Sequence, residues 1–162
     1  MYDLKNLPLP FWLTCINCMT VYISVVNSIS ISQKTLQERF KFDEFQAGSL
    51  FSLPYIIAAG LSPFYGWFVD KYGYRMTLTL IGSFCNFISH LNYYLMSDCD
   101  KCALSITPMI LQSITYTTYA VVVWGYFPYI VDARFLGTAF GLCSSLQNMG
   151  TVIAPLIIGR LL

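Results

Sequence analysis

The chain has 162 residues, of which 56% are hydrophobic and only 10% are charged, whereas a typical soluble domain carries about 25% charged residues. This composition excludes an ordinary soluble domain, and a net charge of +1 excludes the clustered basic surface that a nucleic-acid partner requires. The charges separate five uncharged runs of at least about 20 residues, and such a run crosses a hydrocarbon core of about 30 Å as a helix. We therefore expect an all-α, multi-pass integral membrane protein in contact with membrane lipid.

The first predicted span covers residues 9–32 and contains Cys15 and Cys18 in a CxxC spacing. No second pair and no histidine stands at metal-ligand spacing, so we expect these thiols to pack and no metal to bind. Asn27 lies deep in this span and is a candidate contact for a polar solute. The segment after it, residues 34–44, mixes three basic and three acidic residues, which predicts a solvated amphipathic turn at the membrane surface.

The second predicted span, residues 46–69, contains Pro54 and Pro63 among small residues, a combination that favours kinks and close helix packing. It also contains Tyr55, another candidate solute contact. A tight charged hairpin follows, in which Asp70 offers a carboxylate to helix N-termini or to an arginine. Its glycines allow the chain to reverse and helices to approach. The charged and glycine residues that define this hairpin are Gly66, Asp70, Lys71, Gly73 and Arg75.

The third predicted span, residues 76–97, carries the single histidine of the chain, His90. We interpret it as a packed or interfacial side chain, not as a proton carrier. The loop after this span contains Cys99 and Cys102. Two alternatives are open for this pair: a disulfide if the loop faces an oxidising lumen, and, less favoured, a metal site.

The fourth and fifth predicted spans cover residues 104–130 and 136–160. They contribute further uncharged candidates that could bind a small polar solute between apolar walls; the alternative is hydrogen bonding between helices or interfacial anchoring. These candidates are Tyr116, Trp124, Gln147 and Asn148.

The turn between these two spans carries Asp132 and Arg134. If the spans alternate, it lies on the same side as the hairpin, so these charges are either gating partners of the hairpin or a solvated cluster. After the turn, Gly137, Gly141 and Ser145 recur every four residues and predict a face on which another helix packs.

No Asp, Glu, Lys or Arg lies in the interior of a predicted span, so this part of the molecule shows no proton relay. No paired carboxylates, Ser/His/Asp set or histidine-rich metal site is present either, which predicts that the protein is not an enzyme and needs no cofactor.

The hairpin reads Gly66-Trp-Phe-Val-Asp-Lys-Tyr-Gly-Tyr-Arg75 and resembles the loop signature G-x-x-x-D-[RK]-x-G-x-[RK] of the major facilitator superfamily. The run from Arg134 to Gly150 is similar to the segment that opens the eleventh helix in this family. The resemblance implies a partial major facilitator fold, in which residues 1–162 form most of a C-terminal six-helix half and the spans are helices seven to eleven. It also implies that the hairpin is cytoplasmic and that its residues Gly66, Asp70, Lys71, Gly73 and Arg75 act in conformational gating. A small organic solute is then expected to cross by alternating access between two halves.

Residues 124–131 and the run after them resemble one branch of the superfamily, the lysosomal dipeptide uniporters. That likeness implies dipeptides or similar amino-acid derivatives as substrates and a lysosomal membrane location. Since a complete fold has two halves, we expect the chain to be a fragment or truncated product that needs the missing half or an accessory membrane protein. The alternative is a truncated membrane scaffold that binds a partner through Gly137 and Gly141 and does not itself transport.

Overall fold

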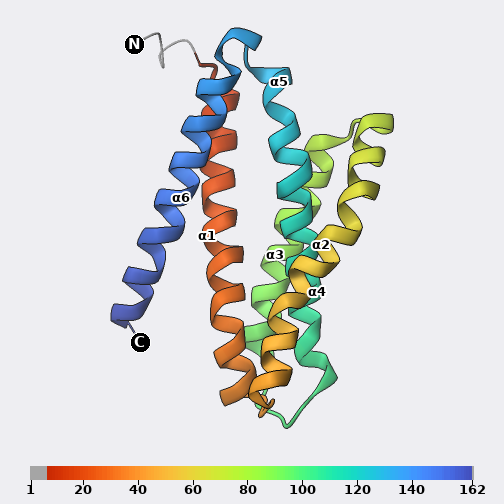
Figure 1. Ribbon diagram of the computed structural model, residues 1–162, viewed down its shortest axis with the longest axis vertical. Coiled ribbons are helices and arrows are strands. Elements are labelled where there is room, and N and C mark those ends of the chain that lie inside the picture. Colours follow the sequence, from red (N-terminus) through yellow and green to blue (C-terminus); the bar gives the residue numbers. More distant parts are fainter. Residues whose placement is uncertain (1–6, 162) are drawn as a thin grey trace.

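The computed structural model describes residues 7–161, and every regular element among them is helical. Residues 1–6 and 162 of the predicted unit lie outside the described residues. Figure 1 shows a bundle of long helices joined by short turns. The expected all-α fold is thereby confirmed. The long helices are α1 (Leu9–Glu38), α2 (Glu44–Tyr72), α3 (Arg75–Leu95) and α6 (Leu136–Leu161).

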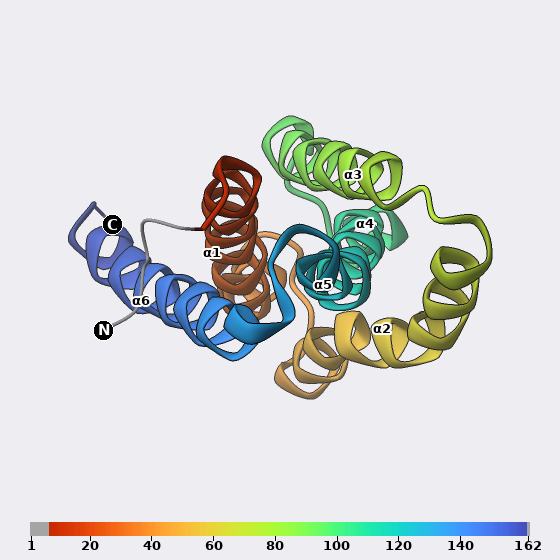
Figure 2. The same cartoon turned by 90° about the horizontal axis from the view of Figure 1, so that it is seen from above.

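The helices pack around α4 (Thr107–Thr118), which lies between α2 and α3 (Figure 2). Helix α1 packs against α2 on one side and against α6 on the other. The α2–α3 turn lies at the same end of the bundle as the start of α6, which we call the hairpin end (Figure 1). The α1–α2 and α3–α4 connections lie at the opposite end, the loop end.

The fourth predicted span is a composite helix. After α4 it continues as a π-helical turn (Tyr119–Val123) and a 3-10 turn (Trp124–Tyr126), and it ends with α5 (Phe127–Ile130). Pro128 lies in the first turn of α5. Proline has no N–H to donate and its ring clashes with the carbonyl four residues earlier, so regular α-helical bonding cannot continue through this segment.

Four helical segments are long and apolar enough to cross a membrane: Leu9–Glu38, Glu44–Tyr72, Ala103–Ile130 and Ala133–Ile157. Helix α3, which coincides with the third predicted span, is not among them. Its sequence includes Asn86, His90 and Asn92, and these polar residues lower its hydropathy. The crossing of α3 therefore stays a prediction.

The segment 34–44 differs from the solvated turn that the sequence predicts. Leu36 and Phe40 are fully buried and pack with Ala47 and Met109 at the loop end. The expectation was wrong for these side chains, because the last turns of α1 direct their apolar residues onto α2 and α4 while the charges remain outside. Helix α2 then starts with a capping box, in which the Asp43 N–H donates to Oε1 of Gln46 across 3.4 Å.

Candidate functional site

Three helices contribute aromatic side chains to one cluster near the π-helical turn. The ring centroids of Tyr55 on α2 and Tyr116 on α4 lie 5.6 Å apart, and those of Tyr116 and Tyr22 on α1 lie 6.3 Å apart. Tyr22 also meets Tyr119 edge-to-face at 6.4 Å. We call Tyr22, Tyr55, Tyr116, Tyr119 and Trp124 the aromatic cluster.

Trp124 joins this cluster to α6. Its indole Nε1–H donates a hydrogen bond to the hydroxyl of Tyr22 across 3.2 Å. The indole ring stacks on Phe140 of α6 with centroids 6.0 Å apart and an interplanar angle of 13°. Trp124 thus links the irregular part of the fourth span to α1 through a hydrogen bond and to α6 through a stacked pair.

The structure brings together three of the predicted solute contacts, Tyr55, Tyr116 and Trp124, but not the amides. Asn27 is buried and its Nδ2 donates to the carbonyl of Ile23 across 2.7 Å, so the donor is used within α1. On α6, Gln147 is half-buried and Asn148 is exposed. Neither side chain hydrogen-bonds to another residue within 7–161. The binding role of all six residues stays a prediction.

Sequence reasoning left Tyr22 and Tyr119 out of the predicted contacts. Tyr119 is buried, and its hydroxyl donates to Oδ1 of Asn17 across 2.6 Å and lies 2.7 Å from Oγ of Ser83. Tyr22 and Trp124 are 102 positions apart in the chain, and no sequence spacing reports such a contact. The available signal was the density of tyrosines on the fourth span, where Tyr116 and Tyr119 stand one helical turn apart.

The chemistry of the aromatic cluster is that of an uncharged recognition surface. Its rings offer apolar contact and cation–π faces, and its hydroxyls and indole N–H offer hydrogen bonds without formal charge. The recess bounded by Tyr22, Tyr116 and Tyr119 is too tight for a water-sized molecule. A solute would therefore meet the outer edge of the cluster, where Tyr55 is 41% exposed.

The α2–α3 hairpin has the tight geometry that its glycine predicts. Gly73 adopts a positive φ of 81°, and its N–H donates to the Val69 carbonyl across 2.9 Å. An N–O distance of 3.8 Å separates Arg75 and Asp70, which is a loose ion pair. The Lys71 ammonium lies 4.9 Å from the ring centroid of Trp67. The charged side chains of the hairpin thus interact with one another and with nearby aromatic rings.

The predicted gating partners Asp132 and Arg134 bind each other. The Arg134 guanidinium donates to both carboxylate oxygens of Asp132 at 3.1 and 3.0 Å, and the Arg134 backbone N–H donates across 3.0 Å. The hydrogen bond from the Arg134 side chain, and then that from its backbone, lowers the pKa of Asp132 to about 2. Within residues 7–161, no ion pair joins this pair to the hairpin, so a gating partnership stays a prediction.

The small-residue face of α6 is open. A Cβ atom placed at Gly137 or Gly141 would have no neighbour within 4 Å, and Ser145 is exposed. Helix α6 instead contacts α1 through a different face, where a Cβ at Gly150 would lie 2.6 Å from Cδ1 of Ile23. The helix that the sequence predicts on the open face is not one of the described helices.

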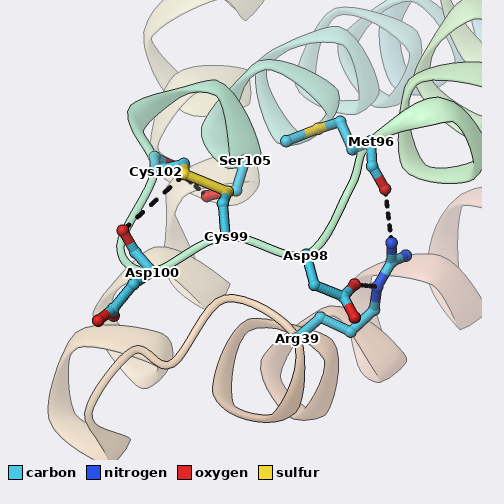
Figure 3. The surroundings of a disulfide bond; sticks show 7 residues. All are labelled: Arg39, Met96, Asp98, Cys99, Asp100, Cys102 and Ser105. Carbon is cyan, nitrogen blue, oxygen red and sulfur yellow. Dashed lines mark hydrogen bonds and ion pairs between the residues drawn. A yellow bond between two sulfur atoms is a disulfide. The ribbon is translucent and has the colours of Figure 1, made fainter.

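At the loop end, Cys99 and Cys102 are joined in a disulfide (Figure 3). The loop is tied to α1 by Arg39, whose guanidinium donates to Oδ1 of Asp98 at 2.7 Å and to the carbonyls of Tyr93 and Met96 at 3.2 and 2.6 Å. This end is opposite the hairpin, so the disulfide would face the lumen if the hairpin is cytoplasmic.

His90 is packed in a polar contact between α1 and α3. Its Nε2 lies 2.7 Å from Oγ of Ser28, and its Nδ1 lies 2.9 Å from the Asn86 carbonyl. Both ring nitrogens thus have hydrogen-bond partners. No group of His, Cys, Asp or Glu within residues 7–161 could hold a metal ion.

Similarities to known proteins identify the family to which this helical bundle belongs. Residues 11–162 match the sequence model of the Major Facilitator Superfamily. The chain is 31% identical over 160 residues to the human lysosomal dipeptide transporter MFSD1, and 29% identical over 160 residues to that of Danio rerio. The alignments cover 99% of this chain but only 33% and 34% of those proteins, so the chain spans about a third of the curated relatives that it matches. From the matched length and the helical bundle with its charged hairpin, we conclude that the chain is a multi-pass integral membrane protein of the major facilitator superfamily, a family of transporters and not of enzymes.

Proposed function

We propose that this chain forms part of a transporter that moves dipeptides or similar amino-acid derivatives across the lysosomal membrane. The observation that carries the proposal is the similarity, along nearly the whole chain, to proteins named lysosomal dipeptide transporters. The aromatic cluster supports it, because hydroxyls, an indole N–H and ring faces suit a small solute with polar and apolar parts. In this proposal Tyr55, Tyr116 and Trp124 contact the solute.

The mechanism proposed is alternating access driven by the solute gradient. Two halves rock about a central site in such transporters, and this chain supplies helices of one half. The interiors of the predicted spans hold no Asp, Glu, Lys or Arg, and the titratable side chain of His90 is hydrogen-bonded between α1 and α3. This pattern supports a transporter driven by the solute gradient, in which this half supplies no charged proton carrier.

The test is uptake of a labelled neutral dipeptide, alanyl-alanine, by proteoliposomes that contain the full-length protein. We expect saturable uptake without an imposed pH gradient, competition by other dipeptides and none by free alanine. Trp124→Ala should lower uptake, whereas Phe45→Ala, which removes an exposed aromatic side chain from the first turn of α2 at the loop end, serves as the control. Lack of saturable uptake across a panel of neutral, acidic and basic dipeptides would contradict the proposal.

The open face of α6 favours a second candidate role, as an assembly surface. Gly137 and Gly141 leave the backbone free for a close helix neighbour, which would be the other transporter half or an accessory membrane protein. Gly141→Leu should abolish co-purification of that partner, and Thr138→Leu on the same helix is the control. Recovery of a heterologous membrane partner without any dipeptide uptake would favour a scaffold over a transporter.

A further inference from the structure

The last two turns of the fourth span are separated from α4 by irregular helix. Residues Tyr119–Val123 are π-helical, Trp124–Tyr126 form a 3-10 turn, and Pro128 removes one backbone donor from α5. Irregular helical segments of this kind bend more readily than regular α-helix, and they often mark hinges. Something other than the helix itself must therefore fix the direction of α5.

One side chain that holds α5, in addition to the apolar packing of Phe127, is Arg75, the first residue of α3. Its guanidinium donates to the hydroxyl of Tyr129 across 3.2 Å, and Cζ lies 4.7 Å from the centroid of the same ring. Arg75 also passes directly over Gly125, where a Cβ atom would come within 3.1 Å of Nη1. One side chain thus contacts both the 3-10 turn and α5.

Arg75 contacts Tyr129 more closely than it contacts its acidic neighbour, Asp70. The Arg75 side chain is only 16% exposed, whereas Asp70 is 82% exposed and its carboxylate lies 3.8 Å away. The hydrogen bond to Tyr129 is shorter than the ion pair to Asp70, and the Tyr129 ring, which is 71% exposed, adds a cation–π contact. The main contact partner of Arg75 is therefore Tyr129, on the fourth span.

The segment that Arg75 holds leads to the aromatic cluster. Phe127 of α5 packs on Phe11 of α1 and on Phe140 of α6, with ring centroids 5.6 and 5.3 Å apart. Trp124, one residue before Gly125, stacks on Phe140 and bonds to Tyr22. A change in the direction of α5 would therefore be transmitted to the side chains proposed to contact the solute.

We infer that Tyr129 and Gly125 are positioning residues that receive Arg75, forming a clamp that locks the hinged end of the fourth span to the α2–α3 hairpin. Release of the clamp would let α5 pivot at the π-helical turn and alter the setting of Trp124. Only the consequence for solute binding rests on the proposed transport function; the clamp itself is a property of the fold.

The clamp is tested by the chemical accessibility of a buried reporter. Val131 follows α5 and is 6% exposed, so Val131→Cys should react slowly with a maleimide in full-length protein reconstituted in lipid nanodiscs. We expect Tyr129→Leu to raise the labelling rate about tenfold, since a charge-assisted hydrogen bond and a cation–π contact are both lost. Tyr129→Phe retains the ring and should give a smaller rise. Gly125→Val should act like Tyr129→Leu, because its side chain displaces Arg75.

Two controls separate the clamp from general loosening. Tyr94→Leu removes an exposed aromatic residue at the other end of α3 and should leave the labelling rate unchanged. A second reporter, Leu36→Cys, is buried at the loop end and should stay protected in the Tyr129→Leu protein. Unchanged labelling at Val131→Cys in both clamp variants would overturn the inference, and so would an equal rise at both reporters.

The labelling assay needs no solute, so its outcome is independent of the transport assay. If the wild-type protein takes up no dipeptide while Tyr129→Leu exposes only the Val131→Cys reporter, the proposed function fails and the clamp stands. If dipeptide uptake is normal while labelling never changes, the clamp fails and the proposed function stands.

Discussion

The indole of Trp124 and the hydroxyl of Tyr22 are joined by a hydrogen bond of 3.2 Å that spans 102 positions of the chain. This bond ties the irregular part of the fourth span to α1 within the aromatic cluster. Both residues are largely enclosed, and the partners on either side are rings, with no charged side chain in the cluster. The geometry of the proposed solute site therefore depends on neutral hydrogen bonds, of which this one joins Trp124 to α1.

The Trp124–Tyr22 bond predicts the effect of two conservative substitutions. Trp124→Phe keeps an aromatic ring against Phe140 and removes the donor, and Tyr22→Phe removes the acceptor. A neutral hydrogen bond contributes about 1 kcal/mol, so each change should lower dipeptide uptake at low substrate concentration about fivefold. The double variant should be no worse than either single one, as measured in proteoliposomes. Additive losses would show that the two side chains act independently.

The loop end yields a prediction about Arg39. Arg39→Lys keeps the charge but cannot donate at once to Asp98 and to two carbonyls, so it should destabilise the fold by about 2 kcal/mol. The double change of Cys99 and Cys102 to serine should cost less, because a bridge across three residues closes a very short loop. Thermal unfolding of the purified protein compares the two variants. A larger loss from the double serine variant would contradict this ranking.

The lowered pKa of Asp132 predicts over which pH range the Asp132–Arg134 pair stays charged. The carboxylate has a pKa lowered to about 2 by the Arg134 hydrogen bonds. A lowered pKa means that the pair is intact above the ordinary carboxyl range and is lost only as the pH falls through about 2. Between about pH 4.5 and about pH 7.5 the pair thus stays charged, and it does not respond to lysosomal acidity. Asp132→Asn should change uptake by the same factor throughout that range; a factor that varies with pH would refute this.

How far the sequence predicted this fold depends on how local each feature is. The clustering of charge predicted helical segments, and the glycine of the hairpin predicted a reversal that Gly73 makes with a φ of 81°. The break in the fourth span had a local cause, Pro128, but the π-helical turn also depends on contacts with other helices. Segment 34–44 was misjudged because its charges are conspicuous, whereas the burial of Leu36 and Phe40 depends on distant Met109.

The candidate site was predicted less completely, because its contacts join residues that are far apart in the sequence. Tyr55, Tyr116 and Trp124 were predicted as single polar residues inside apolar spans, which is a local property. Tyr22, which contacts Tyr116 and Trp124, could not be inferred, because these contacts depend on how α1 lies against the fourth span. Asp132 and Arg134 were predicted to pair with the hairpin because both lie at the same end of the bundle. In the structure these two residues, only two positions apart, form an ion pair with each other.

The packing of α3 predicts that this helix crosses the membrane, although its hydropathy alone does not indicate it. Ser83 and Ser89 hydrogen-bond inside the bundle, to Tyr119 and to the Pro108 carbonyl. The opposite face exposes large apolar side chains that suit lipid: Leu80, Phe84, Phe87 and Leu91. We therefore expect α3 to cross the membrane. Tyr74→Cys and Tyr94→Cys should react with an impermeant maleimide from opposite sides of sealed vesicles; labelling of both from one side would contradict the crossing.

Two glycines of α6 predict opposite responses to the same substitution. At Gly150, a Cβ atom would lie 2.6 and 2.9 Å from the side chain of Ile23 and 3.0 Å from that of Met19. Gly150→Ala therefore requires the Ile23 and Met19 side chains, or α6 itself, to shift, and overpacking of this kind costs about 1–3 kcal/mol. At Gly141 nothing lies within 4 Å, so Gly141→Ala should stabilise the helix by up to about 1 kcal/mol through its higher helix propensity.

The open face at Gly141 separates folding of this half from its assembly. If another helix packs there, Gly141→Ala will raise or leave unchanged the unfolding temperature of the helical half but weaken recovery of the partner, whereas Gly150→Ala will lower the unfolding temperature. Thermal unfolding and co-purification measured on the same two variants distinguish these effects. An equal loss of stability in both would show that the Gly141 face is already covered in the folded protein, and the assembly role would then have to lie elsewhere on the bundle.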